Sequence, residues 1–161
     1  MNMNRLIPIS LFIAFAAAAA PGLAGDDDLV VVVNKSNSVD NVTKAQLKKM
    51  ILGEQPSWSA GKKVSVVLRA TGQPERDGVL RSVCGMSEDD FNQSWMRASF
   101  NGSTATPPKS LPTGQAVRQS VSSSPGAIGF LRAADVDETV KAVTVDGIAA
   151  GQPDYKIKAG K

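Results

Sequence analysis

One short stretch of the chain combines side chains that bind anions. Arg69 ends an apolar run, and a small polar loop containing Gly72 separates it from Pro74. A guanidinium pairs well with oxyanions, and glycine lets a ligand approach the backbone closely. Because Pro74 is a favourable first residue of a helix, the free N–H groups of that helix start would face the same anion. The candidate anion-binding residues in this stretch are Arg69, Thr71, Gly72, Gln73 and Arg76.

A second polar loop, which contains Ser36, follows the β-branched run of residues 29–33. That run predicts a strand buried on both faces inside an α/β sheet. Open α/β sheets bind ligands beside the carboxyl ends of their strands. Ser36 is therefore a further candidate for the anion site, although the same loop also suits an ordinary polar turn.

The composition excludes most catalytic sites. The chain has no His and a single Cys, Cys84. It therefore cannot form a Ser-His-Asp triad, a Cys-His pair, an internal disulfide or a four-cysteine zinc site. The acidic residues 26–28 suit either a metal site or a solvated terminal segment. We expect a protein that is not an enzyme and carries no cofactor, with Cys84 buried as a small apolar side chain.

Positive charge is concentrated in one part of the chain. Between Lys44 and Arg81 there are eight basic and three acidic residues, whereas the whole chain has 18 and 15. Such a patch attracts anions, although its lysines also suit a surface that only keeps the protein in solution. The small overall charge and the few aromatic residues argue against nucleic-acid binding.

Residues 1–24 have the three sections of a secretory signal. A polar start with Arg5 precedes the apolar residues 6–20, and small residues around Ala24 suit a cleavage site. The apolar run is short for a membrane span, so a retained anchor is the less favoured alternative. We expect a periplasmic or secreted protein, with a domain over residues 25–150. Residues 151–161 are expected to form a polar tail that frays.

The hydrophobic pattern predicts a layered α/β domain with a small sheet. Thr43 with Gln46, and Ser87 with Asp90, have the spacing of helix-capping pairs. We expect strands at residues 29–33, 64–68, 127–131 and 139–145, and helices at 43–51, 74–84, 113–122 and after Ser87. Core positions are expected at Trp58, Phe91, Trp95, Met96 and Phe100.

Four stretches of the chain resemble the phosphate-binding component of bacterial phosphate ABC transporters. The most specific is Pro-Gly-Ala-Ile-Gly-Phe-Leu at residues 125–131, which is similar to a Pro-Gly-Ala-Ile-Gly-Tyr segment of that family. Residues 69–76 resemble the family's arginine and Ser-Gly-Thr phosphate loop, with Thr71-Gly72-Gln73 in its place. The other two are residues 44–53 with Trp58 and Gly61-Lys62, and residues 86–108 with Trp95, Phe100, Gly102 and Pro107-Pro108.

The resemblance implies a single three-layer-like lobe of a type II periplasmic binding protein, with a small mixed sheet flanked by helices. It also implies an exported protein that binds phosphate or a similar oxyanion and works with a membrane transporter or a sensor. The family's receptors close two lobes on their ligand, and the chain after Ala24 is long enough for one. Either a second copy of the chain supplies the missing wall, as a homo-oligomer, or the chain is a ligand-free interaction or regulatory module derived from the same fold.

Overall fold

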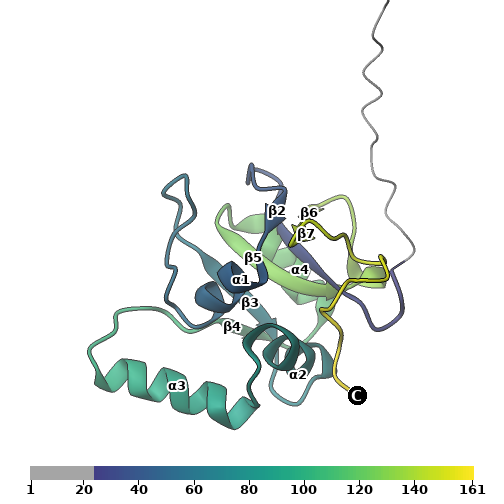
Figure 1. Ribbon diagram of the computed structural model, residues 1–161. Coiled ribbons are helices and arrows are strands. Elements are labelled where there is room, and N and C mark those ends of the chain that lie inside the picture. Colours follow the sequence, from purple (N-terminus) through teal and green to yellow (C-terminus); the bar gives the residue numbers. More distant parts are fainter. Residues whose placement is uncertain (1–23) are drawn as a thin grey trace, which may run out of the picture.

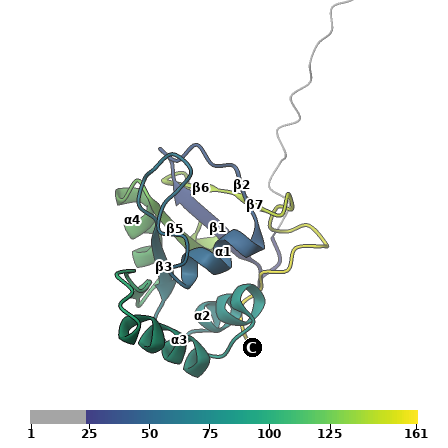
Figure 2. The same ribbon diagram turned by 60° about the vertical axis from the view of Figure 1, so that its left-hand side comes forward.

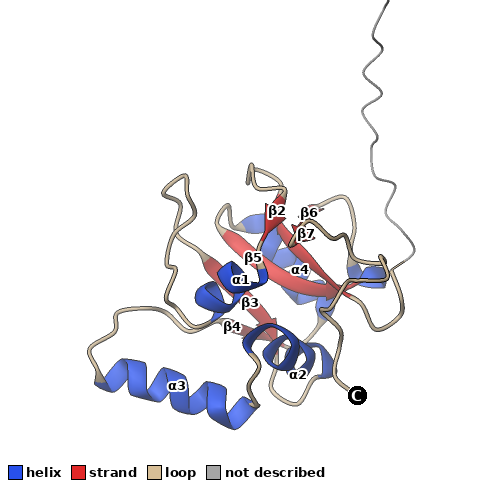
Figure 3. Cartoon of the chain, in the orientation of Figure 1, coloured by secondary structure: helices blue, strands red, loops and turns tan. Residues whose placement is uncertain are grey.

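The computed structural model describes residues 24–161, which form a five-stranded mixed sheet with helices on both faces (Figure 1). The expected leader over residues 1–24 lies almost wholly outside the described residues. Strands and helices alternate along much of the chain (Figure 3). The strands are β1 (Leu29–Asn34), β2 (Asn41–Val42), β3 (Ser65–Arg69), β4 (Lys109–Leu111), β5 (Ala127–Arg132), β6 (Val140–Ala142) and β7 (Thr144–Val145). The helices are α1 (Lys44–Ile51), α2 (Pro74–Val79), the π-helix η1 (Leu80–Cys84), α3 (Glu88–Phe100), α4 (Gly114–Ser123) and the 3-10 turn η2 (Ala133–Asp135).

The directions of the strands decide which loops share an edge of the sheet. The strand order is β4-β3-β5-β1-β6, and β2 pairs separately with β7. β3 runs parallel to β4 and β5, whereas β1 runs antiparallel to β5 and β6. The register pairs Leu29 with Arg132, so the beginning of β1 lies beside the end of β5. The polar loop after β1 and the loop after β3 therefore lie at opposite ends of the strands. We call these two ends the edges of the sheet.

Two apolar layers cover the two faces of the sheet. Val31 and Val33 of β1 face the larger layer, which includes α1, α2, η1, α3 and the C-terminal segment. Val30 and Val32 face the opposite way, toward α4, as the alternation of side chains along a strand requires. Figure 2 shows α4 on one side of the strands and α1 and α2 on the other. The three-layer α/β lobe predicted from the sequence is confirmed.

The helix starts form where the sequence predicts them. Thr43 and Gln46 make a reciprocal capping box at the start of α1, and Ser87 and Asp90 make another at α3. These bonds satisfy backbone N–H groups that a helix start would otherwise leave free. The helical run predicted over residues 74–84 is present, but it widens from α to π winding at Leu80. Within residues 24–161, no helix combines the length and the apolar character that crossing a membrane requires.

Helix α3 is buried on a narrower face than its sequence predicts. Phe91 and Trp95 are buried, as expected, but Met96 is 59% exposed and Phe100 is 84% exposed. The prediction of core positions at Met96 and Phe100 is wrong. The helix lies along the margin of the lobe, where little of the described chain is available to cover a second apolar row (Figure 1). Trp58 and Cys84 are buried as predicted.

The C-terminal segment is part of the core, so the expectation of a frayed tail is wrong. Tyr155 and Ile157 are buried, and the Tyr155 hydroxyl donates to the carbonyl oxygen of Leu29 at 2.6 Å. Asp28 belongs to the acidic run that suited either a metal site or a solvated segment, but it is 2% exposed and forms an ion pair with Lys158. Its carboxylate also accepts from the Gly151 amide at 2.9 Å. The side chains of Tyr155 and Ile157 fill the space beside β1 and hold the C-terminal segment there.

Candidate anion site at the end of strand β3

The loop between β3 and α2 gathers five of the six predicted site residues. Arg69 is the last residue of β3, and Gln73 precedes the first residue of α2. Gly72 has a φ of +83°, a conformation that side-chain-bearing residues rarely adopt, so the turn depends on glycine. The space beside its Cα is open. The residues gathered on this loop and the first turn of α2 are Arg69, Thr71, Gly72, Gln73 and Arg76.

Ser36 does not join this group. It follows β1, whose carboxyl end lies beside the amino ends of β3 and β5, because β1 is antiparallel to β5. Its hydroxyl instead donates to Asn34 Oδ1 at 2.8 Å, and its amide donates to the same oxygen at 2.9 Å. The expectation that Ser36 contributes to the same site is wrong, since it assumed that β1 and β3 point in the same direction.

Arg69 is engaged by the protein on three sides. Its Nη2 donates to Gln73 Oε1 at 2.9 Å, and its Nη1 donates to the carbonyl oxygen of Pro112. Its Nε lies 3.5 Å from Glu75 Oε2. The Arg69 side chain is 13% exposed. An incoming anion would therefore compete with Glu75 and Gln73 for this guanidinium.

Arg76 is more deeply buried and makes a closed ion pair. Its Nε and Nη2 donate to the two carboxylate oxygens of Glu88 at 2.7 and 2.8 Å. Its Nη1 donates to Ser110 Oγ at 3.0 Å, and the guanidinium lies 5.3 Å from the centroid of the Phe91 ring. A two-pronged pair of this kind is strong and geometrically specific. Arg76 therefore fastens α2 to α3 and β4, and its donors are used inside the protein.

The backbone donors of the loop are only partly free. The Gln73 amide donates to the carbonyl oxygen of Ala70 at 3.2 Å. That amide is therefore already hydrogen-bonded within the protein and is not free for the predicted contact with an anion. The Thr71 hydroxyl donates weakly to Glu88 Oε1 at 3.3 Å. Within residues 24–161 the Gly72 amide has no backbone hydrogen-bond partner, so the least committed donors of the loop are Thr71 and Gly72.

Two carboxylates, neither of them predicted from the sequence, complete this site. Glu75 lies between Arg69 and Arg132, whose Nε donates to Glu75 Oε1 at 2.6 Å. Glu88 lies against Arg76. Both occupy the first turn of a helix, where acidic residues are favoured by the helix dipole. That position was visible in the sequence, but their pairing with arginines 6 to 57 residues away was not.

The charge of Glu75 is stabilised by its neighbours. Burial alone raises the pKa of this carboxyl group, but the hydrogen bond from Arg132 and the charges of Arg132 and Arg69 outweigh it. The net result is a pKa below the ordinary value for glutamate. Glu75 is therefore a fixed negative charge near neutral pH, directly beside the arginine predicted to bind an anion.

Both ends of the described chain pack against the same edge. Arg132 Nη1 donates to the carbonyl oxygen of Asp26 at 3.0 Å. The Gly160 amide donates to the carbonyl oxygen of Pro74 at 2.6 Å. A Cβ on Gly78 of α2 would collide with the backbone of Lys158 and Ala159, so glycine is needed there. The surface available to a ligand is thus limited to the side of the loop near Thr71 and Gly72.

The groups that remain unengaged near the loop after β3 are ones that can contact an oxyanion. Over residues 24–161, no group of three or more carboxylate or cysteine side chains is placed to hold a metal ion. The single thiol, Cys84, is buried, and burial raises its pKa to about 11. A thiol with a raised pKa is a poor nucleophile near neutral pH. What remains is a hydroxyl, an amide and the outer side of a partly engaged guanidinium, which together can contact an oxyanion.

The fold is that of one lobe of the substrate-binding proteins of phosphate ABC transporters, although no family model matches the sequence. The chain is similar to such a protein with bound phosphate from Clostridium perfringens, with TM-score 0.67 and 24% identity over 83% of this chain and 53% of that one. It is similar to an ABC-type phosphate transport receptor from Vibrio cholerae, with TM-score 0.66 and 22% identity over 83% and 54%. It is also similar to PstS from Borrelia burgdorferi, with TM-score 0.64 and 14% identity over 83% and 55%. The chain thus spans about half the length of these proteins, and the fold implied by the sequence resemblance is confirmed.

Proposed function

We propose that the protein is an exported, solute-binding-type protein that binds phosphate or a similar oxyanion in connection with phosphate transport. The observation that carries the proposal is the cluster of Arg69, Thr71 and Gly72 on the turn between β3 and α2, with open space beside Gly72. The similar protein from Clostridium perfringens holds phosphate. An oxyanion on the open side would accept from the Thr71 hydroxyl, the Gly72 amide and Arg69.

The affinity of this contact is expected to be low. Glu75 and Glu88 lie within the same cluster and repel an anion, and one lobe leaves the ligand in contact with water. Small-ligand sites usually enclose most of the ligand surface. A second protein surface, either another copy of the chain or a membrane transporter subunit, would exclude water and strengthen the same contacts.

Calorimetric titration of inorganic phosphate into the purified protein tests the proposal. We expect heat that saturates at millimolar phosphate and is lost in Arg69→Ala. Arg81→Ala is the matched control, because Arg81 is an exposed arginine paired only with Asp77 on the same helical run. Absence of heat at millimolar phosphate from a folded sample would overturn the proposal, as would equal loss in the two variants.

A second candidate function is a ligand-free interaction or regulatory module. It is favoured by the pairing of Arg76 with Glu88 and of Arg69 with Glu75, so that each of these two arginines already has a carboxylate partner. The exposed Phe100 offers a contact for a sensor or transporter protein. Growth of the producing strain on limiting phosphate separates the two: Arg69→Ala impairs growth if the anion matters, and Phe100→Ser impairs it if the protein contact matters.

A further inference from the structure

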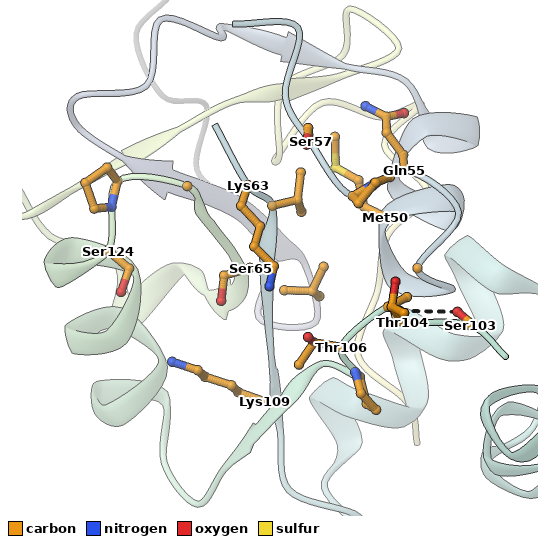
Figure 4. Close-up of a pocket in the computed structure, with 18 of the residues that line it drawn as sticks. Met50, Gln55, Ser57, Lys63, Ser65, Ser103, Thr104, Thr106, Lys109 and Ser124 are labelled. Atoms are coloured by element: carbon orange, nitrogen blue, oxygen red, sulfur yellow. Dashed lines mark hydrogen bonds between the residues drawn. The ribbon is translucent and has the colours of Figure 1, made fainter. Parts of the chain in front are cut away.

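A large hollow lies at the other edge of the sheet, far along the strands from Arg69. Its volume is about 1000 Å³, and it lies at the amino ends of β3 and β5. The residues after α1, the loop over residues 102–107 and the end of α4 form its walls. Figure 4 shows this hollow, with Lys63 and Ser65 near its middle and Lys109 below them on the side of α4. None of the six predicted site residues lines it.

The strand register explains why Ser65 and Lys109 face the same space. Lys109 of β4 lies opposite Val67 of β3, and Val67 packs against α4. Side chains two residues apart on a strand point the same way, so Ser65 lies on the same face as Val67 and Lys109. Lys63 precedes β3, so the alternation along the strand does not apply to it. In Figure 4, Ser65 lies between Lys63 and Lys109. Lys63, Ser65 and Lys109 therefore border the same space.

The edge of β3 adds a backbone donor to this group. The Ser65 amide donates toward β5, to Gly126, and the Ala70 amide donates toward β4, to Leu111. Amides alternate sides along a strand, so the Val66 N–H faces the β4 side. β4 begins only opposite Val67, and the Val66 N–H has no backbone partner within residues 24–161. Val66 lines the hollow, which leaves this donor available to a ligand.

The charge in the hollow is positive and uncompensated. Of residues 24–161, those that line the hollow include Lys63 and Lys109 and no acidic residue. Within the described part of the chain, neither ammonium group forms an ion pair or a hydrogen bond with another side chain. Glu54 is a neighbour in sequence of two lining residues but does not itself line the hollow. An anion here would meet two lysines without displacing a carboxylate.

We propose that this hollow binds an organic phosphate, meaning a phosphate ester whose remaining body is uncharged. Two ammonium groups, one hydroxyl and one amide match the several acceptor oxygens of a phosphoryl group. Met50, Val64 and Val66 line the hollow on the α1 side of β3, around its free edge from Ser65 and Lys109, and supply an apolar wall for the body of the ligand. A volume of about 1000 Å³ suits a small organic molecule and is far more than an inorganic ion fills.

Addition of a peptide strand to β3 is the competing use of the same edge. Strand addition requires a run of free backbone groups along an edge. On β3, only Ser65 and Val66 precede the residue at which β4 begins to pair, so the free edge of β3 is two residues long. The lysines and the hydroxyl give a phosphoryl group more contacts than this short edge gives a peptide.

The test follows backbone amide resonances of the full, isotopically labelled protein during titration with adenosine monophosphate. We expect saturable shifts at the amides of Ser65, Val66 and Lys109, much smaller shifts with adenosine, and weaker binding of inorganic phosphate. The double variant Lys63→Met/Lys109→Met should bind at least about tenfold more weakly, since two charge-assisted contacts are lost. Lys62→Met is the matched control and should bind like the unchanged protein, because Lys62 does not line the hollow.

Several results would overturn this assignment. They are no shift at these amides at millimolar adenosine monophosphate, equal shifts with adenosine, unchanged binding by the double variant, or shifts caused by an extended peptide and not by the nucleotide. If the double variant does not fold, the single variants Lys109→Gln and Ser65→Ala provide the same comparison. Arg69→Ala should leave this binding intact, which separates the assignment from the site at the end of β3.

Discussion

The two edges of the sheet carry positive charge in different ways. At the carboxyl end of β3, Arg69 and Arg76 are paired with Glu75 and Glu88. At the amino end, Lys63 and Lys109 line a hollow that contains no acidic residue. The arginines are mostly buried and hold helices together, whereas the lysines are exposed. A guanidinium with five donors suits the first role and a mobile ammonium suits contact with a ligand in water.

The comparison shows that a cluster of basic residues does not by itself identify a binding surface. What matters is whether the charges are already neutralised by the protein and whether space remains beside them. The edge near Arg69 has paired charges, and both described ends of the chain pack against it. Near Lys63 there is a cavity, and the lysines there have no ion-pair partner among residues 24–161. The first edge is therefore expected to contribute more to stability and the second more to binding.

The largest effect is expected from the C-terminal segment that closes the arginine edge. Tyr155→Ala should lower the free energy of unfolding by about 3–5 kcal/mol, because it leaves a cavity the size of an aromatic ring. Tyr155→Phe should cost about 1 kcal/mol, the value of its hydrogen bond to the Leu29 carbonyl. Urea denaturation measures both. A loss below about 1 kcal/mol for Tyr155→Ala would mean that the segment is not packed as described.

The paired arginine and the unpaired lysine should also differ in their effect on stability. Glu88→Ala removes the carboxylate from a buried Arg76, and we expect a loss of about 2–3 kcal/mol in the free energy of unfolding. Lys109→Ala should change it by less than about 0.5 kcal/mol, since an exposed side chain without a partner is removed. The same urea measurement applies. Equal losses in the two variants would remove the distinction between the two edges.

The features of the fold and of the candidate site that could be predicted from the sequence are those set by contacts between residues close together in the chain. The β-branched run of β1 and the capping boxes at Thr43 and Ser87 involve residues a few positions apart, and they form as predicted. The place of Ser36 depended on the direction of β1 relative to β3, which is set by a pairing with β5 about 100 residues away. Local polarity could not reveal that direction.

The partners of the predicted site were hidden for the same reason. Glu75 is six residues from Arg69 in sequence, but its second arginine, Arg132, is 57 residues away. The exposure of Phe100 had a related cause: its helical spacing matched a core face, but the lobe does not extend far enough to cover it. Periodicity predicts which side chains could be buried, and the extent of the packed neighbour decides which of them are.

Acid should weaken the arginine edge in particular. The pKa of Glu75 is below its ordinary value, so between its folded and unfolded pKa values the unfolded chain binds more protons. The stability from Glu75 is therefore present above about pH 4.5 and is lost as pH falls through the folded pKa. Glu75→Gln should be less stable at pH 7 but lose less on acidification, as measured by urea midpoints from pH 7 to pH 3. Asp77→Asn, on the same helix, is the control, and equal slopes in the two variants would contradict the role of Glu75.

The smallest effect is the most direct test of why the arginine edge should bind anions weakly. If Glu75 competes with phosphate for Arg69, its neutralisation in Glu75→Gln should raise phosphate affinity by roughly three- to tenfold, the size of one partly screened like-charge interaction. Calorimetry at low salt measures it, with Asp77→Asn as the matched loss of one negative charge. A gain that is equal in the two variants would come from net charge alone. A gain confined to Glu75→Gln would show that the edge retains the geometry for an oxyanion and that its own carboxylate occupies the arginine, whereas no gain in either variant would mean that Arg69 serves only to hold the helix.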